Sequence, residues 1–321
     1  MNDFTEPLFG EVAMLPFEKR LFQTKEVRRL KFISQFGGAS LISPLSHSLF
    51  EHTLGIWKLT AIFFPNHRLL RAGAILSQIE GIPFGSTIHS LFTINEKESM
   101  FKNTPFHSNE IHLILQEEKL DWGAVEEVAR KSPFLHGTKE NLGIIGLDRA
   151  LRTLYMVGRL KQKPSHYVSH CYVNERGLHC SAEMAKEFVT VMMDTEQLLS
   201  CKEFGAIDAV ISEAIKCDWA ETGEECDTYS RLSDWEILCI LKTSLSVRAQ
   251  YLIHALLEQP DKFIVREGAT GRGIPFSIYP EYRLPLISED VEISFKNWTE
   301  RLNTLEQTYE VIDFTSLAET I

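Results

Sequence analysis

Apolar residues in the first half of the chain recur at helical spacing, and this periodicity constrains the fold more than any other feature. Between Pro16 and Phe64 the pattern is broken at Gly37-Gly38 and at Ser43-Pro44, which predicts a helix, a loop and a second helix. Within Leu49 to Phe63 apolar side chains occur around most of the helical circumference, as expected for a helix buried on most sides. Further helices are predicted over residues 68–79, 108–116, 122–131 and 146–160.

The second half adds one short β-structure to this helical pattern. Residues alternate between Ser165 and Cys180 around Asn174-Glu175-Arg176-Gly177, which predicts a hairpin with a tight turn. Helical spacing returns over 181–217 and 233–258, and Ser233 with Glu236 matches a capping box at the start of the latter. After Gln259 the helical spacing of apolar residues is lost. Residues 268–285 are predicted to form a loop and residues 288–308 a final helix.

Charge and cysteine content narrow the class of protein. The formal charge of −11 argues against nucleic-acid binding, which uses clusters of Lys and Arg. No apolar run approaches the roughly 18 residues that a membrane helix needs, and Asp3 and Glu6 stand where a signal peptide would be basic, so we expect a cytoplasmic protein with no membrane partner. The six cysteines lie in the second half without a CxxC pair, which predicts reduced thiols.

One N-terminal stretch, Phe17 to Gly55, resembles the opening of the HD-domain phosphohydrolases, especially the deoxynucleoside triphosphate triphosphohydrolases. The resemblance continues to Leu147-Asp148-Arg149 and more faintly to Ile253, so it covers roughly the first 255 residues. Its segments occur in the family's order: Arg28-Arg29-Leu30, Gln35-Phe36-Gly37, Ser40 to Pro44, Phe50 to Gly55, Gly73 to Leu76, Pro83-Phe84, His107 with Glu110, and Leu147-Asp148-Arg149. The resemblance implies an all-α fold: an HD-domain helical core over 1–160, the small β-hairpin and helices packing on it over 161–260, and a C-terminal helical extension, loop and helix, over 261–321.

The resemblance also implies where a metal would bind. In the family a His-Asp pair, an earlier His and a later Asp hold a metal that activates water. His52 corresponds to the first ligand and Asp148 to the last, whereas Ser77 and Gln78 replace the pair, which leaves an incomplete set. Gly81 and Ser86 replace two nearby histidines, while His107 matches a histidine that assists the chemistry.

The side of the site that would contact substrate is eroded as well. Leu49 stands where these enzymes carry an Arg that contacts phosphate, and the family's Asp-x-Asp-x-x-Asp-Tyr-x-x-Arg-Asp becomes the residues from Gly146 to Met156. Gln35 resembles a nucleoside-contacting residue, and Arg149 keeps a positive charge where the family often has one. The candidate ligand-binding residues are therefore Gln35, Arg149 and Arg152.

Each candidate also has a purely structural interpretation. His52 could be a buried histidine paired with a carboxylate instead of a metal ligand. Asp148 could be stabilised by the dipole at the first turn of its helix, by roughly 0.3–1 kcal/mol, and could pair with Arg152 four residues later. Glu80 could in principle substitute for a lost ligand, but on a helix it would lie about 200° around from Gln78.

Three further features have a functional and a structural interpretation. The cluster His166, His170, Cys171, His179 and Cys180 has zinc-binding residue types, but on a strand His166 and His170 would lie about 13 Å apart. Residues 268–273 resemble a phosphate loop without the Gly-Lys-Ser/Thr ending, and a flexible turn explains them. A basic run could contact a polyanion or a second subunit, or form a solvated helix face: Lys19, Arg20, Lys25, Arg28, Arg29 and Lys31.

Two hypotheses of function follow. In the first, the chain is a pseudo-phosphohydrolase that has lost catalysis and acts as a nucleotide- or phosphate-binding, regulatory or structural subunit without a cofactor. In the second, it is an active HD-family phosphohydrolase, with one Fe, Mn or Zn ion at a reduced site using His52 and Asp148, or with metal-free catalysis by His107. By resemblance we expect a homo-oligomer, or an active relative as a hetero-partner, and a small phosphorylated ligand.

Overall fold

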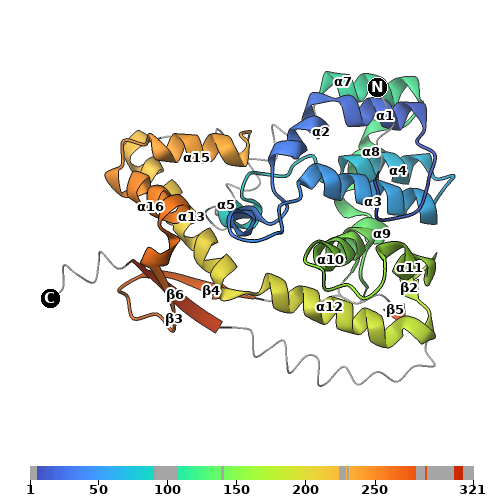
Figure 1. The fold of residues 1–321 in the computed structure, drawn as a ribbon. Coiled ribbons are helices and arrows are strands. Elements are labelled where there is room, and N and C mark those ends of the chain that lie inside the picture. Colours follow the sequence, from blue (N-terminus) through green and yellow to red (C-terminus); the bar gives the residue numbers. More distant parts are fainter. Residues whose placement is uncertain are drawn as a thin grey trace.

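The structure is a computed structural model, and it describes residues 6–89, 91, 108–138, 141–223, 229, 231–279, 286–287 and 307–313. It is mainly helical, with two small sheets (Figure 1). Among the described helices none is long and apolar enough to cross a membrane.

The N-terminal helices enclose one apolar cluster around Trp57, whose ring meets Phe22 edge to face at 5.8 Å between centroids. The central helix of this group begins at a capping box: the Ser48 hydroxyl accepts from the Glu51 amide, and the Glu51 carboxylate accepts from the Ser48 amide. These helices are α1 (Pro16–Gln23), α2 (Lys25–Arg29), α3 (Leu49–Phe63), α4 (Arg68–Leu76), α7 (Asn109–Glu117) and α8 (Trp122–Lys131).

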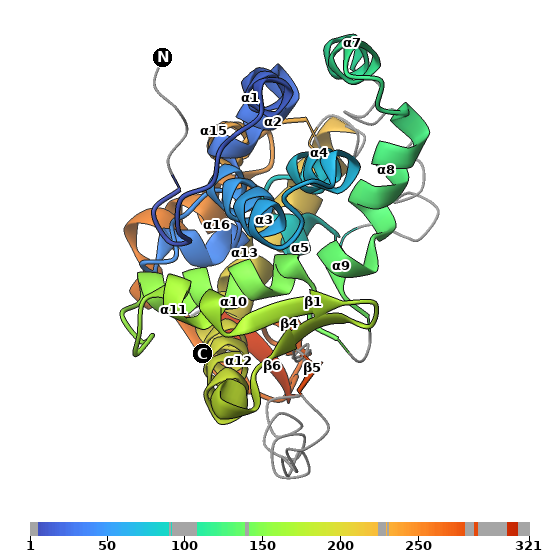
Figure 2. The same cartoon turned by 90° about the vertical axis from the view of Figure 1, so that its right-hand side faces the viewer.

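A second cluster forms around α10 (Ile144–Met156), which lies between α3 and α12 (Ala185–Leu199) in both views (Figures 1 and 2). Leu147, Leu151 and Leu154 of α10 are buried in it. The same region holds α9 (Pro133–His136), α11 (Pro164–Ser169) and the antiparallel hairpin of β1 (Cys171–Asn174) and β2 (Gly177–Cys180), to which β5 (Leu286–Ile287) adds a parallel strand.

The third cluster joins the C-terminal helices to a three-stranded antiparallel sheet. The helices are α13 (Lys202–Thr222), α15 (Asp234–Lys242) and α16 (Val247–Glu258), and α5 (Gly85–His89) packs on α13. The sheet has the order β3-β6-β4, with β3 (Phe263–Glu267) and β4 (Ile274–Ile278) on either side of β6 (Gln307–Asp313).

The helical core and the hairpin turn between Asn174 and Gly177 agree with the sequence prediction. Two other predictions were wrong. Residues 164–169 form α11 and not a strand, so the hairpin begins only at Cys171. The C-terminal part contains strands: β4 lies within the predicted loop, and β6 takes the last two residues of the predicted helix over 288–308, the rest of which lies outside the described residues.

The C-terminal error has a physical reason. In β4 the burial of successive residues alternates, with Pro275 exposed on an edge strand where its missing amide costs no ladder bond. The central strand β6 lies about 30 residues further along the chain and pairs with both neighbours. Residues 309–313 of β6 are all buried, so this strand lacks the alternation of exposed and buried residues that would have marked it as a strand.

Candidate functional site

His52 and Asp148 meet where α3 packs against α10. The His52 Nδ1 atom lies 2.6 Å from Asp148 Oδ2, and both side chains are buried. Gly55, one turn after His52, makes this contact possible: a Cβ atom there would lie 1.8 Å from Asp148 Oδ1 and 2.2 Å from Arg152 Nη2. The helices therefore approach closely at Gly55, with the carboxylate fitted against its backbone.

Arg152, one turn after Asp148 on α10, extends this pair into a network. Its Nη2 and Nε donate to the two oxygens of Asp148 at 2.7 and 3.0 Å, a two-point fork. Nη2 also lies 3.0 Å from Glu6 Oε1, while Glu6 Oε2 accepts from the amides of Leu8 and Phe9. Because α10 begins at Ile144, Asp148 lies in the second turn and not the first, so the pairing with Arg152 and not the helix dipole explains it.

The charges of the network follow from these contacts. Burial would raise the pKa of Asp148, but the Arg152 charge and the hydrogen bonds from His52 and Arg152 lower it overall. Burial lowers the pKa of His52, and this outweighs the opposing effect of Asp148. At neutral pH the site therefore holds an ionised Asp148, a charged Arg152 and a neutral imidazole.

The residues present do not fit a divalent metal. Both oxygens of Asp148 are already hydrogen-bonded, and the Arg152 guanidinium puts a positive charge beside them. Ser77 donates its hydroxyl to the Ala74 carbonyl, and the Gln78 amide nitrogen lies 3.4 Å from the Ser77 hydroxyl. Within the described part of the chain, no three His, Cys, Asp or Glu side chains are grouped so that they could hold a metal ion.

Each of the three predicted ligand-binding residues contacts another side chain of the protein. Gln35 Oε1 lies 2.6 Å from His47 Nε2, and Arg152 belongs to the buried network. Arg149 Nη2 contacts Glu196 Oε1 at 2.7 Å beside a cavity of about 170 Å³ between α9, α10 and α12. His107 lies outside the described residues.

Glu80 forms an ion pair with α8. It lies in a turn after α4, and its Oε1 contacts Arg130 of α8 at 2.6 Å. Burial raises the pKa of Glu80 to about 7, although the Arg130 charge opposes this. The ion pair with Arg130 therefore accounts for this partly buried carboxylate without a bound metal ion.

His47 is a residue of the site that the sequence reasoning missed. Burial, with the nearby positive charge of Arg152, lowers the pKa of His47 to about 3, so the ring is neutral. Its Nδ1 atom is buried and has no hydrogen-bond partner among the described residues. The available signal was its place five residues before His52, within the motif that carries the resemblance.

The histidine and cysteine cluster differs from the prediction. Because His166 is in α11, its ring centroid lies 4.7 Å from that of His170, so the predicted separation of 13 Å was wrong. His170 Nδ1 lies 2.9 Å from the His166 carbonyl oxygen. Cys171 lies opposite Cys180 in the register of the two hairpin strands. The five described cysteines are free thiols.

The glycine-rich loop over 268–273 holds a carboxylate of the protein itself. Glu310 of β6 accepts from the Thr270 amide at 2.9 Å and hydroxyl at 2.6 Å, and from the amides of Arg272 and Gly273. These bonds lower the pKa of Glu310 despite opposing desolvation. The amides that could have cradled a phosphate are thus directed at this side chain.

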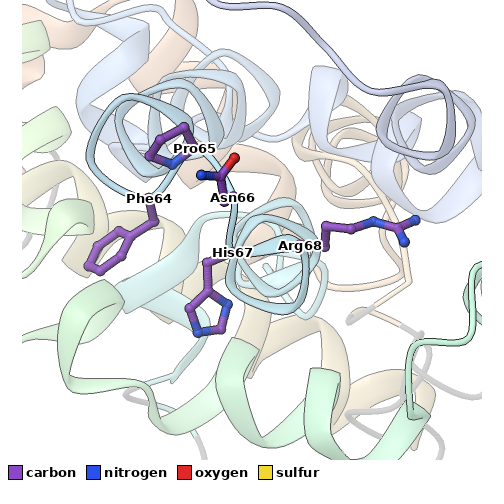
Figure 3. A pocket seen from close by; sticks show the side chains of 5 residues that line it. All are labelled: Phe64, Pro65, Asn66, His67 and Arg68. Carbon is purple, nitrogen blue, oxygen red and sulfur yellow. The ribbon is translucent and has the colours of Figure 1, made fainter.

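A cavity of about 440 Å³ lies at the surface beside Phe64, Pro65, Asn66, His67 and Arg68. Its side chains do not converge: Phe64 and His67 extend to one side and Arg68 to the other (Figure 3). His67 caps α4 by accepting from the Leu70 amide, and Arg68 pairs with Glu118. None of the residues that line this cavity belongs to the His52 network. The side chains of His67 and Arg68 are instead engaged in contacts that stabilise the fold.

The basic run at the N-terminus is partly engaged in structure. Arg20 pairs with Glu117, Arg29 donates to the Gly81 carbonyl oxygen, and the Lys31 ammonium lies 4.7 Å from the centroid of the Phe50 ring. These three residues therefore have contacts within the protein, and neither a polyanion nor a second subunit is needed to explain them.

Comparisons with known proteins place this geometry in context. No family model matches the chain. Over 57 residues it is 37% identical to the deoxynucleoside triphosphate triphosphohydrolase SAMHD1 of Xenopus laevis and, equally, to that of Gallus gallus, a match that covers 17% of this chain and only 9% of either relative.

Two solved structures resemble the whole chain. A phosphohydrolase from Bacteroides thetaiotaomicron superposes with a TM-score of 0.69 at 13% identity, covering 98% of this chain and 99% of that one. A hypothetical protein from Aquifex aeolicus gives a TM-score of 0.64 at 16% identity, covering 99% and 98%. The solved structures establish the fold, and together with the sequence match they support an HD phosphohydrolase-like family for this chain.

Proposed function

We propose that this chain is an HD-domain protein in which a buried ion network has replaced the metal centre, and that it acts by binding or assembly instead of by hydrolysis. The observation that carries the proposal is the state of Asp148: its two oxygens accept from His52 and from the Arg152 fork. An ion that approached this carboxylate would compete with buried, charge-assisted bonds and would be repelled by the Arg152 guanidinium.

The chemistry of phosphate esters supports the same conclusion. Their uncatalysed hydrolysis is extremely slow, so an enzyme needs strong electrostatic stabilisation, which a metal supplies by activating water and neutralising charge. Here Ser77 and Gln78 bring no charge to the two central ligand positions. Arg152 carries a permanent positive charge, but its guanidinium already forms ion pairs with Asp148 and Glu6.

A small phosphorylated ligand would be held at Arg149. Its side chain is about one-third exposed and lies beside the 170 Å³ cavity, whereas Arg152 is buried. Pockets for whole drug-sized ligands usually measure about 300–1,000 Å³, so this cavity suits a phosphate group better than an entire nucleotide. Binding would have to compete with Glu196, and Arg149→Gln should therefore abolish a phosphate-induced rise in melting temperature, while Arg159→Gln at an exposed position should not.

The deciding experiment measures metal content and hydrolysis on the same protein. The chain would be purified without chelator or histidine tag, analysed by inductively coupled plasma mass spectrometry, and assayed with deoxynucleoside triphosphates and Mn²⁺. We expect no stoichiometric metal and no hydrolysis above the level of the His52→Gln variant. About one equivalent of Fe, Mn or Zn that His52→Gln loses, or hydrolysis that Asp148→Asn abolishes, would establish the alternative, an active phosphohydrolase with an altered site.

A further inference from the structure

One face of α15 is exposed although it carries large side chains. Trp235, Cys239 and Lys242 follow one another at spacings of four and three residues, so they share a face of the helix. Trp235 is 64% exposed and Cys239 is also exposed, whereas Ile237, Leu238 and Leu241 on the other side are buried. The helix lies at an outer edge of the molecule (Figure 1), so this face is accessible.

Exposed apolar side chains follow the C-terminal end of α15. Leu245 and Val247, in the connection to α16 and at its first turn, are 76% and 80% exposed. Large exposed apolar side chains close together on a surface are typical of an interaction site.

We propose that this α15 face, comprising Trp235, Cys239 and Lys242 with Leu245 and Val247 beyond its end, binds the same face of a second copy of the chain around a two-fold axis near Cys239. In such a pair the two α15 helices run antiparallel. Residues equally far before and after Cys239 then face each other, so Glu236 lies opposite Lys242 of the second copy. Trp235 likewise lies opposite Thr243 of the second copy, and Leu245 of that copy follows two residues later.

The charges of this face favour a second copy over a foreign partner. Glu236 lies three residues before Cys239 and Lys242 three residues after it. A two-fold axis at Cys239 therefore pairs each Glu236 with Lys242 of the other copy and produces two identical ion pairs. The Ser233 hydroxyl and amide donate to Glu236 and hold its pKa below the usual value, so this carboxylate stays ionised. The Lys242 Nζ atom lies 5.8 Å from the centroid of the Trp235 ring, which holds the positive charge on the same face.

Local pairing matters because two copies repel each other overall. Each chain carries a formal charge of −11, which opposes association unless the contact itself is complementary. The face as a whole is close to neutral and supplies an exposed Trp, the residue type that most often dominates interface energies. This inference is independent of the function proposed above, since it requires neither a ligand nor an inactive site.

The first test is the oligomeric state of the full chain, measured by sedimentation velocity over a range of concentrations. We expect a reversible dimer whose dissociation constant rises about 30-fold or more in Trp235→Glu, the effect of losing a central anchor. Leu113→Glu on α7 is the matched control, because Leu113 is 56% exposed and lies on another helix. A monomeric wild type, or a dimer that Trp235→Glu leaves intact, would overturn the proposal.

A charge-reversal pair separates the interface from the stability of α15. Glu236→Lys and Lys242→Glu should each weaken the dimer, and the double variant should recover most of the lost affinity. Glu236→Lys also removes the capping box with Ser233, but Lys242→Glu cannot restore that cap, so recovery can only come from pairing between copies. A double variant that dimerises no better than Glu236→Lys would refute the antiparallel arrangement.

Cross-linking at Cys239 tests the position of the axis. A short bismaleimide should join two copies of the wild type, and Cys239→Ser should abolish the product although other thiols remain. Cross-linking that persists in Cys239→Ser would place the interface elsewhere.

Discussion

Replacing Gly55 by alanine should reveal how strongly the ion network depends on the close approach of α3 and α10. The new Cβ atom would lie 1.8 Å from Asp148 Oδ1 and 2.2 Å from Arg152 Nη2, distances that real contacts do not reach. Either the helices separate or the fork between Asp148 and Arg152 opens. Opening a buried ion pair costs about 3–5 kcal/mol, a large share of the 5–15 kcal/mol that stabilises a typical domain.

The assay is thermal and urea unfolding followed by circular dichroism. With 321 residues and about 2.1 cal/mol/K of unfolding entropy per residue, this loss corresponds to a fall of about 4–7 °C in melting temperature. Gly123→Ala on α8 is the control: its Cβ would meet only Asp121 Oδ1, at 3.5 Å, and alanine is the better helix former. If Gly55→Ala matched Gly123→Ala in stability, the close packing of the network at this point would be refuted.

Further variants probe other groups that the structure explains. Arg152→Ala should cost about 3–5 kcal/mol at neutral pH, and because the native pKa of Asp148 is lowered, the loss should shrink as the pH falls below about 4, measured by urea unfolding. Asp208 of α13 accepts from the Gly38 amide at 3.1 Å, and burial raises its pKa to about 6. Its contribution to stability is therefore present below about pH 4 and lost as the pH rises through 6. Asp208→Asn should flatten that decline, by up to about 3 kcal/mol. Glu310→Ala should expose residues 268–273 to limited proteolysis at a higher rate, because their amides lose their acceptor.

The helical core could be predicted because its information is local. The apolar spacing gave α3 and α10 nearly to their ends, and the Ser233 and Glu236 pair located the start of α15. Helical pairs four residues apart are equally local, so the contact between Asp148 and Arg152 was foreseen and is confirmed. Strand β6 could not be foreseen in this way, since its partners are far away in the chain.

The sequence could predict that metal ligands are lost, but it could not predict the buried ion network that replaces them. The substitutions at Ser77 and Gln78 are visible in the sequence. The participation of Glu6 is not, because it reaches Arg152 from 146 residues away and belongs to no motif. His47 was overlooked for a related reason: its role follows from burial beside charges that come from another helix.

These observations lead to a final prediction about rebuilding the metal site. In the family pattern that this chain resembles, a Tyr stands at the position of Arg152. Two differences therefore separate this chain from a complete ligand set. Ser77 and Gln78 replace the His-Asp pair, and Arg152 binds the remaining carboxylate of Asp148. We therefore expect Ser77→His with Gln78→Asp to bind no stoichiometric Mn²⁺, because Asp148 stays paired with a cation. Adding Arg152→Tyr should release the carboxylate and allow about one equivalent to bind, measured by mass spectrometry on protein whose fold is verified by circular dichroism. If the double variant bound Mn²⁺ as well as the folded triple variant, Arg152 would not be what keeps the site closed to metal.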